Sequence, residues 1–135
     1  MTTSTAFDLE SLNQQFEIAT PTEILAWSVQ NIPTGLVQTS AFNVDDIILT
    51  HIFYNVLQHP VPVIFLDTLY HFPQTLELVA QAKEIYNLDL KTYKTPDVDS
   101  REAFTAKFGE ALWDTDIAKF HDITKIEPLL RGLDE

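Results

Sequence analysis

Two short polar segments each follow an apolar, β-rich run, and they are the first places in this sequence where chemistry is expected. One spans residues 39–44, where a run that ends at Ser40 gives way to a predicted helix; the other spans residues 67–72, directly after the run 61–66. Backbone N–H groups at a helix N-terminus hold a phosphate or sulfate without a lysine nearby. The first segment therefore allows a small anionic ligand at the start of its helix.

The residue types exclude several other chemistries. The sequence contains no cysteine, which removes disulfides, thiolate metal sites, iron–sulfur clusters and thiol nucleophiles. Its four histidines are scattered without i, i+4 pairing, so no zinc motif is expected. His71 lies in the second polar segment and is a further candidate for ligand contact.

Charge limits the possible partners. The chain of 135 residues has 8 basic and 20 acidic residues, a formal net charge of −12, and every basic residue lies at Lys83 or later. Duplex binding needs clustered positive charge, and an anionic membrane repels an acidic chain, so neither nucleic acid nor membrane is an expected partner. No signal-peptide pattern and no apolar run of about 18 residues occurs, so a cytoplasmic protein is expected.

Helix signals and β-rich runs alternate along the chain. Asp8 and Thr20 are predicted to cap the first two helices, the second of which opens with a capping box and ends near Pro33. Further helices are expected over residues 45–57, 73–87, 100–108, 111–120 and 126–133. Strands are expected over residues 35–40, 61–66 and 88–93.

This alternation predicts an α/β fold with a parallel sheet of about three strands flanked by helices and a helical C-terminal segment, in a single domain over residues 1–135. Ligands of such sheets bind beyond the carboxyl ends of the strands, where both polar segments fall. The aromatic residues Phe72, Phe104 and Trp113 are expected in the core.

Three groups of residues carry recognisable motifs in order along the chain. They are Thr39-Ser40-Ala41-Phe42-Asn43-Val44-Asp45, then Leu66-Asp67-Thr68-Leu69-Tyr70-His71-Phe72-Pro73-Gln74-Thr75, and last residues 107–113 with 121–131. The first resembles the modified pyrophosphate loop (PP-loop) Ser-Ala-Phe-Gly, the second Leu-Asp-Thr-Gly-Tyr-x-Phe-Pro-Glu-Thr, and the third Tyr-Gly-x-x-Leu-Trp with a later Lys-Val-Glu-Pro. Together they resemble the N-terminal portion of the phosphoadenosine phosphosulfate (PAPS) reductase family, within the adenine nucleotide alpha hydrolase-like superfamily.

The resemblance implies a ligand site. Ser40 and the amides that follow it would hold a phosphate or sulfate, Asp67 and Thr68 would face the adenosine, and Lys125 would lie near the phosphosulfate end. Arg131 would support Lys125 or pair with Glu127. The full set of implied ligand-binding residues is Ser40, Ala41, Phe42, Asn43, Asp67, Thr68, Leu69, Lys125 and Arg131.

The resemblance also implies an activity in sulfate assimilation. In the family, a cysteine near the far C-terminus attacks the sulfur of PAPS, adenosine 3′,5′-bisphosphate leaves, and thioredoxin or glutaredoxin then releases sulfite. Relatives that reduce adenylyl sulfate with an iron–sulfur cluster carry Cys-Cys just before the lysine, where this chain has Phe120 and His121. A cluster-free type without a cofactor is therefore expected, with an adenine nucleotide as its ligand.

The sequence departs from the family pattern at three points. Asn43 stands where the PP-loop has glycine, and asparagine tolerates a positive φ. Leu69 stands at the glycine of Asp-Thr-Gly, where a positive φ would strain it and its bulk would crowd a nucleotide. The sequence ends at Glu135 without the family's catalytic cysteine or the later strand that pairs with the first strand. An open sheet edge follows from this, and a homo-oligomer is expected.

Other interpretations of the same residues stay open. The segment 40–46 is also compatible with an ordinary strand-to-helix turn in which Asp45 and Asp46 serve only the helix dipole. Asp67 and Thr68 would equally serve as caps for the helix that begins at Pro73. Three functions follow: part of a PAPS reductase, a non-catalytic adenine-nucleotide-binding module, or an interaction module.

Overall fold

The computed structural model describes residues 7–134, and within them the chain divides into two compact units. The first unit ends at Leu36 and the second begins at Val37. The expectation of a single domain stays a prediction, and the two units are described in turn.

The first unit contains two helices, α1 (Leu9–Glu17) and α2 (Pro21–Asn31). The Asp8 carboxylate accepts a hydrogen bond from the Ser11 amide at 3.2 Å, and the Thr20 hydroxyl accepts one from the Glu23 amide at 3.2 Å. Both predicted helix starts are therefore confirmed. The Trp27 ring packs edge-on against Phe16, with ring centroids 5.3 Å apart.

The second unit is built on a parallel sheet in the order β1–β2–β3. Its strands are β1 (Gln38–Ser40), β2 (Val63–Asp67) and β3 (Leu90–Lys94). Ser40 pairs with Phe65 in the register between β1 and β2, and Asp67 pairs with Lys94 in the register between β2 and β3. The predicted class, an α/β fold with a three-stranded parallel sheet, is confirmed.

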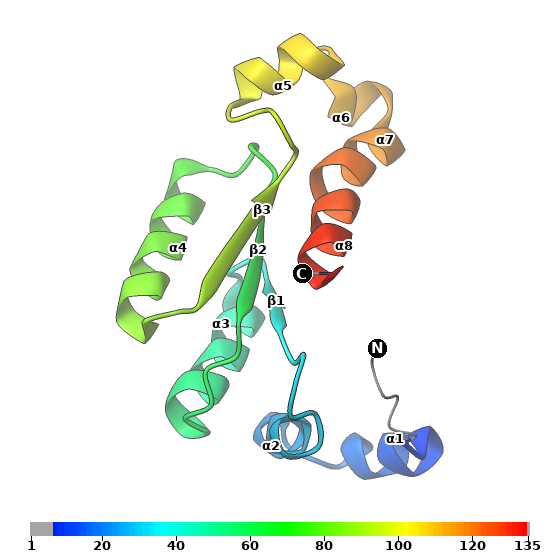
Figure 1. Cartoon of the computed structure of the whole chain (residues 1–135), viewed down its shortest axis with the longest axis vertical. Helices are drawn as coiled ribbons and strands as arrows, with labels where there is room; N and C mark the ends of the chain where they lie inside the picture. The colour runs from blue at the N-terminus through cyan, green and yellow to red at the C-terminus, as the bar shows by residue number, and fades with distance from the viewer. Residues whose placement is uncertain (1–6, 135) are drawn as a thin grey trace. The chain divides into compact units, whose positions relative to one another are not determined.

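Helices cover both faces of this sheet (Figure 1). The first face carries α3 and α4, and the second carries α8. The helical elements of the second unit are α3 (Val44–His51), η1 (Ile52–Val56), α4 (Pro73–Tyr86), α5 (Arg101–Phe108), α6 (Leu112–Thr115), α7 (Ile117–His121), η2 (Asp122–Ile126) and α8 (Glu127–Asp134). None of the helices in the described part of the chain is long and apolar enough to cross a membrane.

Two details of these helices differ from the sequence-based expectation. The segments η1 and η2 are π-helical, a local widening that sequence periodicity does not reveal. The helix expected over residues 111–120 is interrupted at Asp116, where φ is −150° and ψ is 80°. Asp116 instead caps α7, because its carboxylate accepts a hydrogen bond from the Lys119 amide at 3.1 Å.

Two apolar clusters hold the second unit together. The first lies between the sheet and the helices α3 and α4, and the second lies among the C-terminal helices. The first cluster contains Phe42, Val63, Phe65, Val79, Ala82 and Leu88, and the second contains Val98, Phe104, Leu112 and Phe120.

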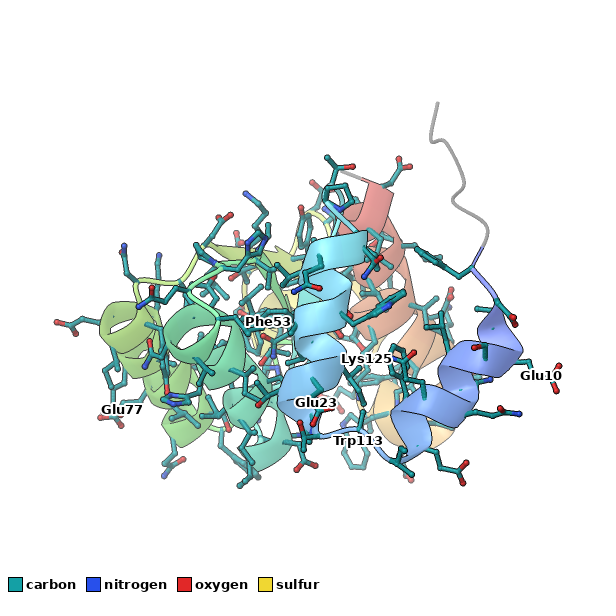
Figure 2. The ribbon with its side chains drawn as sticks, turned by 90° about the horizontal axis from the view of Figure 1, so that it is seen from below. Glu10, Glu23, Phe53, Glu77, Trp113 and Lys125 are labelled. Carbon is teal, nitrogen blue, oxygen red and sulfur yellow. The ribbon has the colours of Figure 1, made fainter. Side chains whose placement is uncertain are left out.

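The predicted core positions are only partly correct. Phe104 is fully buried, as predicted, whereas Phe72 is 72% exposed and Trp113 is 52% exposed. Phe72 immediately precedes α4 as its N-cap residue, and Trp113 lies on the four-residue helix α6. The acidic residue Glu77 points outward from α4 into solvent (Figure 2).

Candidate functional site

The loops that follow β1 and β2 leave the sheet at the same edge. The two strands are parallel neighbours, so their carboxyl ends lie together. A cavity of about 340 Å³ opens at this edge. Its lining residues are Thr39, Ser40, Ala41, Asp46, Ile64, Leu66, Thr68, His71, Lys125 and Leu129.

Strand alternation explains the apolar part of this cavity. Successive side chains of a strand point to opposite faces. Val63 and Phe65 therefore enter the first core cluster, whereas Ile64 and Leu66 line the cavity on the other face. Leu129 of α8 also lines the cavity, which gives it an apolar surface between the sheet and the C-terminal helix.

The loop after β1 is held by hydrogen bonds among its own residues. The Phe42 amide donates to the Ser40 hydroxyl at 3.1 Å, and the Asp46 amide donates to Asn43 Oδ1 at 2.9 Å. Asn43 thereby caps α3 with φ −78°, so the tolerance of asparagine for a positive φ is not needed at this position. The positive φ belongs to Phe42, at 60°, whose ring packs edge-on against Phe65 in the core.

Asp46 contributes a carboxylate to this loop. Its Oδ2 accepts a hydrogen bond from the Ala41 amide at 2.8 Å, and both residues line the cavity. The sequence indicated Asp46 only as a favourable charge for the helix dipole. The hydrogen bond between Asp46 and Ala41 depends on the turn through Phe42, and no local pattern in the sequence predicted that turn.

The loop after β2 turns through Leu69, whose φ is 68°. The Leu69 amide donates to the Asp67 carboxylate at 2.9 Å, and the Tyr70 amide donates to the Thr68 hydroxyl at 3.4 Å. These bonds form within the loop, and the N-cap of α4 is Phe72, without a side-chain cap bond. The interpretation of Asp67 and Thr68 as caps for α4 is therefore wrong.

The Leu69 side chain packs against the second core cluster. It is not among the residues that line the cavity, and the expected crowding of a ligand by its bulk stays a prediction. The positive φ at this position agrees with the expectation of backbone strain, which costs about 1–3 kcal/mol at a non-glycine residue.

His71 is fixed at the wall of the cavity. Its ring stacks on Phe65 with centroids 5.1 Å apart, and Nε2 lies 3.0 Å from the Leu66 carbonyl oxygen. Because a carbonyl only accepts hydrogen bonds, Nε2 carries the proton in this contact. In the sequence, only its position in the second polar segment indicated that His71 lies at the site.

The two predicted basic residues differ in position. Lys125, which is labelled in Figure 2, lies on η2. It also lines the cavity. It forms no ion pair with any residue that the structure describes. Arg131 lies on α8, where it pairs with Glu127 at 3.1 Å and donates to the Lys94 carbonyl at 2.6 Å.

The structure therefore brings four of the nine predicted ligand-binding residues to one cavity, namely Ser40, Ala41, Thr68 and Lys125. Phe42, Asn43, Asp67 and Leu69 shape the two loops without lining the cavity, and Arg131 lies outside it. Their contact with a ligand stays a prediction. Sequence reasoning missed Ile64, Leu66 and Leu129, although strand alternation was a usable signal for the first two.

The cavity combines one ammonium group, one carboxylate, an imidazole and three hydroxyl-bearing side chains near an apolar surface. Within residues 7–134, no group of three or more histidine, aspartate or glutamate residues is arranged to hold a metal ion. A parallel sheet with a partly polar cavity at its carboxyl edge is the arrangement that α/β proteins use to bind small ligands.

Comparison with known proteins assigns the family. The family model of the phosphoadenosine phosphosulfate reductase domain matches residues 35–135. The chain belongs to the phosphoadenosine phosphosulfate reductase family, which confirms the resemblance inferred from the motifs.

Curated relatives agree with this assignment. The chain is 37% identical over 132 residues to a phosphoadenosine phosphosulfate reductase of Emericella nidulans, with 94% of this chain and 42% of the relative covered. It is 34% identical over 125 residues to a probable phosphoadenosine phosphosulfate reductase of Schizosaccharomyces pombe, with 92% of this chain and 46% of the relative covered. The chain thus spans about half the length of these relatives.

A solved structure shares the fold. The crystal structure of the PAPS reductase from Candida auris, a phosphate complex, superposes with a TM-score of 0.89 at 32% sequence identity. The match covers 99% of this chain and 65% of the Candida auris chain.

Proposed function

We propose that the cavity binds PAPS or adenosine 3′,5′-bisphosphate, and that this chain supplies the nucleotide-binding part of a thioredoxin-dependent PAPS reductase. One observation carries the proposal: three segments far apart in the sequence, the two strand-end loops and the Lys125 segment, line the same cavity. These segments are also the three that carry the family motifs.

The lining residues suggest how such a ligand is oriented. The Lys125 ammonium is the basic group that attracts the phosphate and sulfate groups, and the hydroxyls of Ser40 and Thr68 offer donors to their oxygens. Ile64 and Leu66 offer the adenine ring an apolar surface.

The proposed reaction of the whole protein needs a thiol. A thiolate forms a bond to the sulfur of PAPS, the bond from sulfur to the bridging oxygen breaks, and adenosine 3′,5′-bisphosphate leaves with the electron pair. One thiol of a dithiol of the thioredoxin or glutaredoxin type then attacks the cysteine sulfur of the S-sulfocysteine, and sulfite leaves with the electron pair of the broken S–S bond. The second thiol attacks the resulting mixed disulfide, so the dithiol becomes a disulfide and the protein's thiolate is released. Because this chain contains no cysteine, we assign it nucleotide binding and not the attack on sulfur.

The binding role is tested by calorimetry with adenosine 3′,5′-bisphosphate. Lys125→Ala should weaken binding by about tenfold or more, because a charge-assisted contact contributes about 1.5–3 kcal/mol and each 1.4 kcal/mol is about tenfold. Lys119→Ala is the matched control, since Lys119 is an exposed lysine on α7 that does not line the cavity. Equal losses in both variants would count against the site, and no heat and no thermal shift at millimolar nucleotide would reject the binding function.

The assignment of activity has its own test. Mixed with PAPS, thioredoxin and thioredoxin reductase, the chain alone should release no sulfite while still binding nucleotide. Sulfite release above the protein-free background would overturn the assignment.

The second candidate is a non-catalytic adenine-nucleotide-binding or interaction module derived from the same family. The absence of cysteine and the carboxylate of Asp46 inside the cavity favour it. Nucleotide binding without turnover, even when a thiol donor is supplied, would support a binding module. No nucleotide binding at all would leave the interaction module.

A homo-oligomer is a further part of the proposal. In the described residues β1 pairs only with β2, so its other edge offers unpaired backbone groups to a second copy of the chain. Size-exclusion chromatography with light scattering should show a mass above 15.4 kDa at micromolar concentration. A clean monomer would reject this part.

A further inference from the structure

The amides of the loop after β1 are already used by side chains of the same loop and helix. The Ala41 amide donates to Asp46, the Phe42 amide to Ser40 and the Asp46 amide to Asn43. A phosphate or sulfate that binds at a helix start depends on such amides. The first of these acceptors is unlike the other two because it is a carboxylate, and its residue lines the cavity together with Ser40.

The position of Asp46 is fixed through its backbone. Its carbonyl accepts from Gln38 Nε2 at 2.9 Å and from the Thr50 hydroxyl at 3.0 Å. Thr50 is fully buried and Gln38 is 5% exposed, so the anchor is internal to the fold. The carboxylate is therefore held at the cavity on a rigid support.

We propose that Asp46 is a specificity-determining residue that occupies the anion position of the loop after β1. Its carboxylate takes the Ala41 amide that a phosphate or sulfate oxygen would take, and its charge repels an anion at that point. Ligand anions are thereby directed toward Lys125, and the bare chain binds them weakly. This inference rests on the proposed nucleotide site.

Asp45 provides a matched control. It precedes Asp46 in the first turn of α3 and has the same charge and the same relation to the helix dipole. It is exposed and does not line the cavity. A general effect of removing one negative charge should appear equally in Asp45→Ala and Asp46→Ala.

The experiment measures the affinity of the wild-type chain and of both variants for adenosine 3′,5′-bisphosphate and for adenosine by calorimetry. Asp46→Ala should bind the bisphosphate roughly tenfold more tightly than the wild type, which corresponds to about 1.4 kcal/mol. Its affinity for adenosine, which has no anionic group, should not change. Asp46→Asn keeps an acceptor for Ala41 but removes the charge, so its gain should be intermediate.

Two outcomes overturn the inference while the proposed function stands. One is equal affinity of the wild type and Asp46→Ala for the bisphosphate, and the other is an equal gain in Asp45→Ala. If no variant binds the nucleotide, the proposed function fails, and a titration with inorganic sulfate decides the role of Asp46. Sulfate should then shift the Ala41 amide resonance in Asp46→Ala but not in the wild type, and the same response in both would overturn the inference.

Discussion

The loops after β1 and β2 leave the sheet at one edge, turn through one non-glycine residue of positive φ each, and are stabilised in different ways. In the first loop the turning residue, Phe42, is buried in the core, and Asp46 ties the loop to its own helix. In the second loop the turning residue, Leu69, is half-buried. Arg101, 32 residues further along the chain, donates from Nε to the Leu69 carbonyl at 2.9 Å and from its NH2 group to the His71 carbonyl at 3.4 Å.

The difference shows that a turn with a positive φ at a non-glycine residue can be stabilised by two separate routes. The first route places the positive φ at Phe42 and offsets its strain by burying an aromatic ring. The second accepts the strain at Leu69 and adds a distant cation that holds the loop carbonyls. We therefore expect the first loop to depend on the burial of Phe42, and the second loop to depend in part on its surface contact with Arg101.

The largest expected effect on the free energy of unfolding comes from removing the Phe42 ring. Phe42→Ala keeps the unfavourable φ but creates a cavity beside Phe65, so it should lower the free energy of unfolding by about 3–5 kcal/mol. Leu69→Ala is the matched change in the second loop and should cost about 1 kcal/mol, because Leu69 is only half-buried. Urea unfolding followed by circular dichroism measures both changes in the free energy of unfolding. Similar costs would contradict the conclusion that the first loop depends more strongly on core burial than the second.

A smaller effect is expected at Thr50, which anchors the first loop. Thr50→Val removes the one hydroxyl proton that the Asp46 carbonyl and Gln38 Oε1 share, and it should cost about 1–3 kcal/mol. Thr124→Val is the control, since Thr124 is equally buried but donates only to the Phe120 carbonyl of its own helical segment. If Thr50 anchors the first loop, the Ala41 amide should exchange hydrogen faster in Thr50→Val but not in Thr124→Val. Equal exchange in both variants would contradict this role of Thr50.

A contact at the opposite edge of the sheet, where β2 and β3 begin, is expected to stabilise both loops equally. It therefore serves as a reference for the difference between them. The Tyr54 hydroxyl donates to the Val61 carbonyl at 2.6 Å and accepts from the Asp89 amide at 3.2 Å, just before β2 and β3 begin. Tyr54→Phe should cost about 1–2 kcal/mol at neutral pH. Neither loop should then exchange its amides faster than the other.

This contact also predicts a pH dependence. Burial, reinforced by the nearby Asp89 charge, raises the pKa of Tyr54 above its ordinary value of about 10. Because the pKa is raised in the folded state, the protonated Tyr54 hydroxyl contributes its full stabilisation of the fold below about pH 10. This contribution is lost as the pH rises through the raised pKa. The free energy of unfolding should therefore fall more steeply above pH 10 in the wild type than in Tyr54→Phe, and parallel slopes would contradict the assignment.

The elements of the fold were accessible from the sequence because local patterns specify them. The apolar run before Asp67 predicted a buried parallel strand, and Thr20 with Glu23 predicted a helix start. The burial of aromatic residues was less accessible, since Phe72 and Trp113 are exposed and their burial depends on what tertiary packing brings near them.

The site was accessible only in outline. Parallel strands place their carboxyl ends together, so the meeting of the two loops followed from the fold class alone. The bond from Ala41 to Asp46 required knowing that Phe42, and not Asn43, takes the positive φ. The part played by Leu129 required the packing of α8 on the sheet, which no local pattern encodes.

The smallest expected effect on stability is at Arg101, and it tests the second route most directly. Arg101 is exposed, and its guanidinium lies 5.0 Å from the centroid of the Tyr70 ring in addition to its two carbonyl contacts. Arg101→Ala should change the free energy of unfolding by less than about 1 kcal/mol. The amides of Leu69 and Tyr70 should nevertheless exchange several-fold faster, because the carbonyls that fix the loop lose their donor.

Lys107→Ala controls for the loss of a cation from the same helix, since Lys107 lies near the other end of α5 and contacts Asp97 and Phe108 instead. Exchange of the Ala41 amide should stay unchanged in both variants, because the first loop is tied to its own helix by Asp46. If Arg101→Ala accelerated exchange in both loops equally, the two turns would be one cooperative unit. The two turns of positive φ would then be stabilised together and not separately in each loop.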